Sequence, residues 1–260
     1  MRGRLLCAII CGFLLLTAMT AQADSKIGVV LLHGKTGMPG QLTKLSEALT
    51  TAGYVVATPE MCWSKTRIFD KNLQGCLAEI DAAINGLRHQ GLAKIVLGGT
   101  SQGGVAVLDY AATHPDLAGV IALAPAADPL TPSKYPDLAR GLQTARDLVS
   151  AGKGDIATDL PDLASGKTIS VHATPNNYLS FHCASSPIGT VQGMMQNVLP
   201  QIRIPLLWIA GSSDPTQKIG PQAFASVPRN ALSRYVQVAA DHGGTPNASA
   251  AAVLDWLKAL

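Results

Sequence analysis

Charged residues are scarce in this chain, because Asp, Glu, Lys and Arg make up only 14% of its 260 residues. The chain also lacks internal repeats, low-complexity tracts and a sustained heptad pattern. These absences exclude a disordered tail, a collagen-like fibre and a coiled coil. The remaining composition, with 47% hydrophobic residues, is that of a globular protein.

An excess of positive charge is missing as well. The formal net charge is +3, but Arg2 and Arg4 lie in a segment that we expect to be removed. Without these two, 18 of the 20 Lys and Arg remain against 17 Asp and Glu, a net charge of +1. Nucleic acids and anionic lipid surfaces are bound by clustered basic residues, and the sequence shows no such cluster. We therefore expect a small-molecule partner.

The longest apolar run, Leu5–Met19, is too short for a transmembrane helix, which needs roughly 20 apolar residues. Arg2 and Arg4 precede the run, and the small-x-small triplet Ala21-Gln22-Ala23 follows it. This order predicts a signal peptide over residues 1–23, with cleavage after Ala23. We therefore expect an exported protein, periplasmic or secreted, without a membrane anchor after cleavage. A retained anchor helix is the alternative.

Cysteine is rare: only Cys62, Cys76 and Cys183 remain after the expected cleavage. An oxidising compartment permits a disulfide, and the odd count leaves one thiol over. We predict a Cys62–Cys76 bridge, because it closes a short local loop. The alternative is three reduced, separately buried cysteines.

Short apolar segments alternate with helical patterns along most of the chain. We expect strands at Ile27–Leu32, Tyr54–Ala57, Lys94–Gly98, Val120–Leu123, Pro205–Ala210 and Tyr235–Val238, and helices at Leu42–Leu49, Leu73–Leu87, Gly103–Thr113 and Ala248–Leu257. Such alternation predicts one α/β domain over residues 24–260, with a mostly parallel sheet and helices on both faces.

The alternation fails between Asp128 and Ile202, a stretch rich in proline with one helical pattern at Leu138–Leu148. A structureless loop of this length is improbable inside a compact domain. We predict that residues 129–203 form an inserted cap of short helices, which covers the mouth of the site and sets substrate choice.

The clearest local motif is G-x-S-x-G, present as Gly99-Thr100-Ser101-Gln102-Gly103. An apolar strand leads into it and a helix follows, which is the context of a nucleophile elbow. In such an elbow Ser101 is exposed on a tight turn, and Gly99 and Gly103 let the helix and the neighbouring strand approach. The alternative is a glycine-rich turn with an inert serine.

On these residues the chain resembles the α/β-hydrolase superfamily over nearly all of its mature length. The resemblance implies a nucleophile, an acid and a histidine in that order. Asp214, in a Gly-Ser-Ser-Asp-Pro loop after a strand, and His242, after the last strand, fit the second and third positions. Asp128 also follows a strand and is the alternative acid. We interpret Asp241, next to His242, as a loop-shaping residue.

The same resemblance implies an oxyanion hole made by the backbone N–H groups of Lys35 and Gln102. Lys35 belongs to the His33-Gly34-Lys35-Thr36 segment that follows the first expected strand. In this interpretation His33 is structural, and the Lys35 side chain is available to face substrate or solvent. His182, within the expected cap, is interpreted as a surface or core histidine.

Cofactor motifs are absent from the sequence. The segment Gly34-Lys35-Thr36 lacks the earlier glycine of a P-loop, since position 29 is Val29, and neither a dinucleotide fingerprint nor metal-ligand spacing occurs. We predict a cofactor-independent serine hydrolase that cleaves a carboxylic ester, or an amide, through an acyl-enzyme. The alternatives are an acyltransferase, a peptidase, and a silent ligand-binding protein that keeps the fold.

Overall fold

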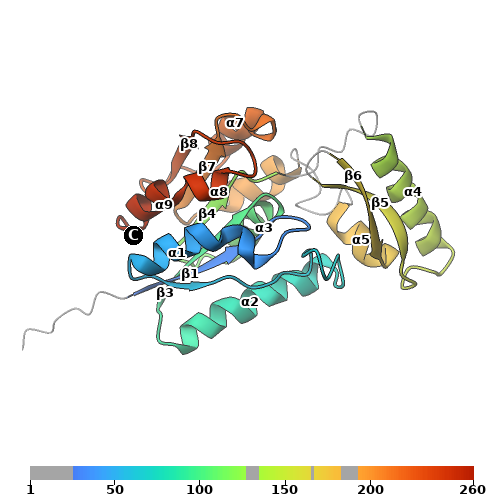
Figure 1. Ribbon diagram of the computed structural model, residues 1–260, viewed down its shortest axis with the longest axis horizontal. Coiled ribbons are helices and arrows are strands. Elements are labelled where there is room, and N and C mark those ends of the chain that lie inside the picture. The colour runs from blue at the N-terminus through green and yellow to red at the C-terminus, as the bar shows by residue number, and fades with distance from the viewer. Residues whose placement is uncertain (1–25, 127–134, 165–166, 183–192) are drawn as a thin grey trace, which may run out of the picture.

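The computed structural model describes residues 26–126, 135–164, 167–182 and 193–260 (Figure 1). The expected signal peptide, Asp128 and Cys183 lie outside these ranges. The core is a six-stranded sheet with strand order β2-β1-β3-β4-β7-β8, in which every neighbouring pair is parallel. Its strands are β1 Ile27–Leu32, β2 Val55–Ala57, β3 Lys94–Thr100, β4 Gly119–Leu123, β7 Leu206–Gly211 and β8 Arg234–Val238. The predicted α/β-hydrolase fold is confirmed.

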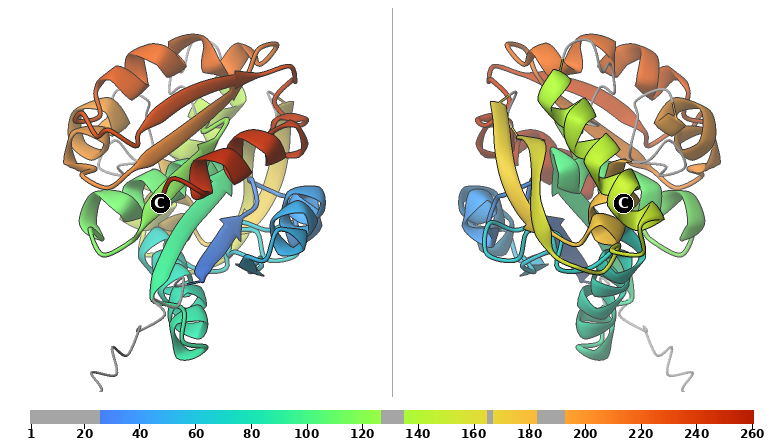
Figure 2. Two further views of the ribbon diagram at one scale, coloured as in Figure 1. Left: turned by 90° about the vertical axis from the view of Figure 1, so that its left-hand side faces the viewer. Right: turned by 90° about the vertical axis from the view of Figure 1, so that its right-hand side faces the viewer.

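Both faces of the sheet are covered by helices (Figure 2). In β1, Val29 and Leu31 pack into one core cluster, whereas Val30 and Leu32 pack into the other. Because successive side chains of a strand point to opposite faces, a strand buried on both faces is apolar throughout. One face carries α1 Thr43–Thr51, α8 Thr245–Ala248 and α9 Ala250–Leu257, and the other carries α2 Leu73–His89, α3 Gln102–Thr113 and α7 Gly220–Ala225.

A separate lobe lies beyond the carboxyl edge of the sheet (Figure 1). It consists of α4 Pro136–Ser150, β5 Thr158–Ala164, β6 Lys167–Ala173 and α5 Pro175–His182. The expected insertion contains helices, but it also contains an antiparallel hairpin that was not predicted, formed by the seven-residue strands β5 and β6. Pro161 argues against a strand in the sequence, but a two-stranded sheet consists of edge strands, where proline is tolerated.

The last part of the predicted insertion lies with the core rather than with the lobe. The short helical segments Met194–Val198 and Leu199–Gln201 pack against α3. Their buried side chains, Met194, Val198 and Leu199, belong to the same core cluster as the α3 face of the sheet.

The predicted Cys62–Cys76 disulfide is present in the structure. Its Cα atoms are 5.7 Å apart, and it ties the segment after β2 to the first turn of α2. That segment also supports the loop after β1, because the Met61 N–H donates to the His33 ring and the Trp63 indole donates to the His33 carbonyl, at 3.0 and 2.9 Å.

We expect the double variant Cys62→Ala/Cys76→Ala to lower the free energy of unfolding by about 3 kcal/mol, since the bridge closes a loop of about 15 residues. Chemical denaturation of the variant beside the wild-type protein measures the loss. Reductant should destabilise the wild-type protein and leave the double variant unchanged. A cross-linked peptide containing Cys183 in a non-reducing peptide map would contradict the pairing.

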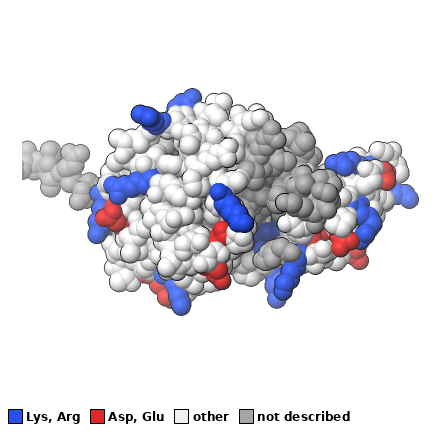
Figure 3. Space-filling model, turned by 90° about the horizontal axis from the view of Figure 1, so that it is seen from above, with Lys and Arg blue, Asp and Glu red and all other residues white. Residues whose placement is uncertain are grey.

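Two surface features concern possible partners. In the part of the chain that the structure describes, no helix is both long and apolar enough to cross a bilayer. Figure 3 shows one face of the molecule, over which Lys and Arg are distributed with Asp and Glu among them. This face offers no continuous basic stripe of the kind that binds a polyanion.

Candidate active site

Ser101 lies on the sharp turn between β3 and α3. Its backbone has φ 56° and ψ −119°, a positive φ that is costly for a residue with a side chain. Hydrogen bonds hold the turn in this shape: Ser101 N–H donates to the Leu123 carbonyl at 3.0 Å, and the Ser101 carbonyl accepts from Val105 and Ala126 at 3.0 and 3.3 Å. The strained turn lifts the serine clear of the sheet at its carboxyl edge.

The glycines around Ser101 are required by close backbone contacts. A Cβ at Gly99 would lie 2.4 Å from the Gly103 carbonyl oxygen, and a Cβ at Gly103 would lie 2.6 Å from the Leu32 carbonyl oxygen. A Cβ at Gly34 would lie 3.1 Å from the Ser101 Cβ. These absent side chains let α3 and the loop after β1 approach the serine.

The structure brings Ser101, His242 and Asp214 together in one hydrogen-bonded series. His242 Nε2 lies 2.9 Å from Ser101 Oγ, and His242 Nδ1 lies 2.7 Å from Asp214 Oδ2. The Asp214 side chain is fully buried, whereas the His242 ring is 28% exposed. In the tautomer that fits both contacts, Nδ1–H donates to the carboxylate and Nε2 accepts the serine proton.

Asp214 is held by a polar network that the sequence analysis did not identify. Its Oδ1 accepts from the Thr216 N–H at 2.9 Å and from the Thr216 hydroxyl at 2.7 Å. The Gln217 amide group donates to Thr216 Oγ1 and to the Pro125 carbonyl, and it accepts from the Trp208 indole at 3.1 Å. Asp214 is the N-cap of the short helix Pro215–Ile219, and the Asp-Pro-Thr sequence is the local signal from which the Thr216 contact could have been predicted.

Of the other two candidate carboxylates, the structure describes only Asp241. Asp241 Oδ1 accepts from the Gly244 N–H at 2.7 Å, which shapes the loop as predicted. Asp128 lies outside the described ranges. Within those ranges, no group of three or more His, Cys, Asp or Glu is placed to hold a metal ion.

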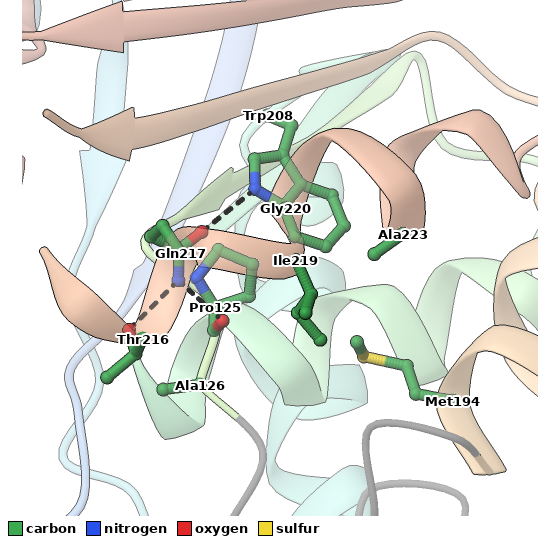
Figure 4. Close-up of a pocket in the computed structure, with 9 residues that line it drawn as sticks. All are labelled: Pro125, Ala126, Met194, Trp208, Thr216, Gln217, Ile219, Gly220 and Ala223. Carbon is green, nitrogen blue, oxygen red and sulfur yellow. Dashed lines mark hydrogen bonds between the residues drawn. The ribbon is translucent and has the colours of Figure 1, made fainter.

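A small pocket opens beside this network (Figure 4). Its walls come from the residues after β4, from Trp208 within β7, from the segment between Thr216 and Ile219, from α7 and from Met194. The lining residues are Pro125, Ala126, Met194, Trp208, Thr216, Gln217, Ile219, Gly220 and Ala223. Since Ala126 N–H contacts the Ser101 carbonyl and Thr216 contacts Asp214, the pocket adjoins the Ser101 turn.

The loop after β1 passes next to Ser101 and is fixed on both sides of Lys35. The Gly34 N–H donates to Gln41 Oε1 at 2.9 Å, and the Thr36 N–H donates to the Trp63 carbonyl at 2.9 Å. Gln102 is the first residue of α3, so its N–H has no acceptor within the helix. The backbone of both predicted oxyanion-hole residues therefore lies close to the serine.

His33 supports this loop from inside, as predicted. Its ring is buried, and burial lowers its pKa. The neutral imidazole donates from Nδ1 to the Gly34 carbonyl at 2.8 Å and accepts at Nε2 from the Met61 N–H. The two ring nitrogens thereby join the loop after β1 to the segment after β2.

The expectation for the Lys35 side chain is wrong. Instead of facing substrate or solvent, it is 9% exposed and reaches across to the lobe. Its Nζ donates to both carboxylate oxygens of Asp162, at 3.2 and 3.3 Å, and to the Leu163 carbonyl at 3.0 Å. The partners lie 127 residues apart in sequence, so no local pattern indicates the pair.

With this geometry in place, a protein-family model described as serine aminopeptidase, S33, matches residues 23–239. The chain belongs to this α/β-hydrolase family. The match includes Ser101 and Asp214 and ends three residues before His242.

Individual relatives agree with this assignment. The chain is 31% identical over 148 residues to a thermostable monoacylglycerol lipase of Bacillus sp. (strain H-257), a match that covers 56% of this chain and 58% of the relative. The chain therefore spans less than two thirds of the length of that relative.

Two solved structures share the fold over nearly the whole chain. A structure from work on LipS and LipT, two metagenome-derived lipolytic enzymes, aligns with a TM-score of 0.63 at 23% identity and covers 90% of this chain and 93% of its own. A monoacylglycerol lipase of Paleococcus ferrophilus aligns with a TM-score of 0.60 at 20% identity and covers 89% and 94%.

Proposed function

We propose that the protein is a serine hydrolase that cleaves carboxylic esters through an acyl-enzyme. The observation that carries this proposal is the series Ser101 Oγ–His242 Nε2 and His242 Nδ1–Asp214 Oδ2, at 2.9 and 2.7 Å. A serine hydroxyl is a poor nucleophile until a neighbouring base accepts its proton. The geometry supplies the base and the carboxylate that orients it.

In the acylation step, Ser101 Oγ attacks the ester carbonyl carbon while its proton passes to His242 Nε2. The Lys35 and Gln102 N–H groups stabilise the negative charge on the carbonyl oxygen, a role that preorganised donors fill at little reorganisation cost. His242 then gives the proton to the departing alcohol oxygen, which leaves the acyl group on Ser101. A water molecule, deprotonated by His242, attacks the acyl-enzyme and releases the acid.

The buried environment of Asp214 supports its assignment to the third role. With Oδ1 satisfied by Thr216, Oδ2 is directed at the imidazole and stabilises the imidazolium that forms in each half-reaction.

A peptidase is the second candidate, because the matching family model is described as a serine aminopeptidase. Lipases and peptidases share the acyl-enzyme mechanism and differ in the leaving group. Ester specificity is supported by the monoacylglycerol lipase relative, which aligns over part of its length.

We expect nitrophenyl esters of increasing acyl length to be hydrolysed with an optimum chain length, and the matching nitroanilides to be cleaved far more slowly. Steady-state kinetics on the two series measure this preference. Faster cleavage of aminoacyl anilides would favour the peptidase. Transfer of the acyl group to an added alcohol in preference to water would favour the acyltransferase. If no ester or anilide of either series is turned over, a silent binding protein would be favoured.

A further inference from the structure

A buried polar cluster joins the lobe to the loop after β1. Asp162, on β5, is fully buried, and it contacts Lys35 Nζ at 3.2 and 3.3 Å and His182 Nε2 at 3.2 Å. The Leu163 N–H also donates to Asp162 Oδ1 at 2.6 Å. One carboxylate on the lobe thus binds a lysine of the core and a histidine at the end of α5.

Aromatic rings surround this cluster and keep it from solvent. Lys35 Nζ lies 5.8 Å from the centre of the Phe69 ring. The His182 ring packs edge-on against Phe69, with centroids 6.1 Å apart, and in a tilted arrangement against Tyr178, with centroids 4.7 Å apart. Burial alone would raise the pKa of Asp162, but the charges of Lys35 and His182 outweigh it and hold that pKa below its usual range. The carboxylate is therefore ionised at neutral pH.

A buried ion pair of this kind is a weak source of stability, because desolvation of the two charges offsets most of their attraction. The ion pair instead fixes the position of the Lys35 side chain relative to the lobe. Lys35 stands between Gly34 and Thr36, whose N–H groups are already bound to Gln41 and Trp63. The contact with Asp162 adds a restraint on Lys35 itself. Lys35 is the residue of this loop whose backbone N–H is assigned to the oxyanion hole.

We propose that Asp162 is a positioning residue, which through Lys35 holds the oxyanion-hole loop in its active shape when the lobe is seated. The inference rests on the proposed ester hydrolysis. It makes the lobe part of transition-state stabilisation as well as a cover over the site. Loss of the contact shifts the Lys35 N–H relative to the developing oxyanion and leaves the contacts among Ser101, His242 and Asp214 intact.

The test is the Asp162→Asn variant of the full protein, whose kinetics on the best ester substrate are compared with those of wild type. We expect kcat to fall about 10- to 100-fold, because misplacement of a catalytic group by about 1 Å costs about 100-fold. We expect KM to change by less than about threefold, since the oxyanion contacts strengthen only in the transition state. Binding of a trifluoromethyl ketone analogue, which places an oxyanion in the hole, should weaken in parallel with kcat/KM.

The matched control is Asp159→Asn. Asp159 lies on the same strand and pairs with His172 at 2.8 Å, but both side chains are on the surface, 77% and 68% exposed. This variant removes an aspartate–histidine contact from the same hairpin and should leave kcat and KM unchanged.

A second readout does not depend on turnover. Amide hydrogen exchange in residues 33–37 should be faster in Asp162→Asn than in wild type and unchanged in Asp159→Asn. If wild type hydrolyses no ester, the proposed function fails, and this exchange measurement still decides whether Asp162 holds the loop.

Should Asp162→Asn fail to fold, Lys35→Met/Asp162→Asn removes both charges together and is expected to fold with the same loss of kcat. Wild-type kcat with unchanged exchange in whichever variant folds would overturn the inference. A rise in KM at constant kcat would also overturn it, because it would assign Asp162 to substrate binding.

Discussion

Replacement of Ser101 with alanine is expected to lower kcat for ester hydrolysis by about 10⁶-fold, the scale found when a triad nucleophile is removed. The variant loses the Oγ atom that attacks the carbonyl and that His242 Nε2 contacts at 2.9 Å. Alanine meets the same backbone strain at φ 56° as serine does, so the elbow should keep its shape.

The measurement is kcat on the best nitrophenyl ester, with thermal unfolding as the check on folding. Ser212→Ala is the matched control, since Ser212 is exposed in the loop before Asp214 and should tolerate the change at full activity. Activity of Ser101→Ala within tenfold of wild type would rule out Ser101 as the nucleophile.

Asp214→Asn is expected to lower kcat by about 10⁴-fold, the loss found for this substitution in a well-studied triad. The hydrogen bonds around Asp214 explain why. The Thr216 N–H needs an acceptor at the Oδ1 position, so the amide oxygen of asparagine stays there and its NH₂ faces His242 Nδ1. Nδ1 must then accept, the ring proton moves to Nε2, and Nε2 can no longer take the proton of Ser101.

Two asparagine variants serve as comparisons for Asp214→Asn. Asp128→Asn and Asp241→Asn should each lose far less activity, because Asp214 occupies His242 Nδ1 and Asp241 caps its own loop. The measurement is kcat for all three variants at equal folded fraction. A larger loss in Asp128→Asn than in Asp214→Asn would move the acid to Asp128 and leave Ser101 and His242 in their roles.

The sheet and the positions of the triad residues could be predicted because their signals are local. A strand buried on both faces is an apolar run, as in Ile27–Leu32, and the sequence range and the observed strand coincide. Ser101, Asp214 and His242 each follow a strand, and parallel strands bring their carboxyl ends to one edge. The resemblance to the α/β-hydrolase superfamily assigned the roles of these three residues, and the topology of the sheet placed them near one another.

What could not be predicted depends on long-range contacts. Pro161 lies in a strand because the hairpin leaves an edge for it, which a single sequence does not reveal. The pairing of Lys35 with Asp162, and that of Gln217 with the Pro125 carbonyl, need groups from distant segments to meet. The sequence therefore predicted the lobe as an insertion. It predicted neither the hairpin of the lobe nor the contact of the lobe with the loop after β1.

The most direct test of the proposed mechanism is to locate the adduct formed with a fluorophosphonate. Attack by an activated serine forms an Oγ–phosphorus bond and expels fluoride. We expect one adduct per chain, on the peptide that contains Ser101, with esterase activity lost in proportion to labelling and no adduct in Ser101→Ala. An adduct on another residue, or full esterase activity after complete labelling of Ser101, would contradict the mechanism.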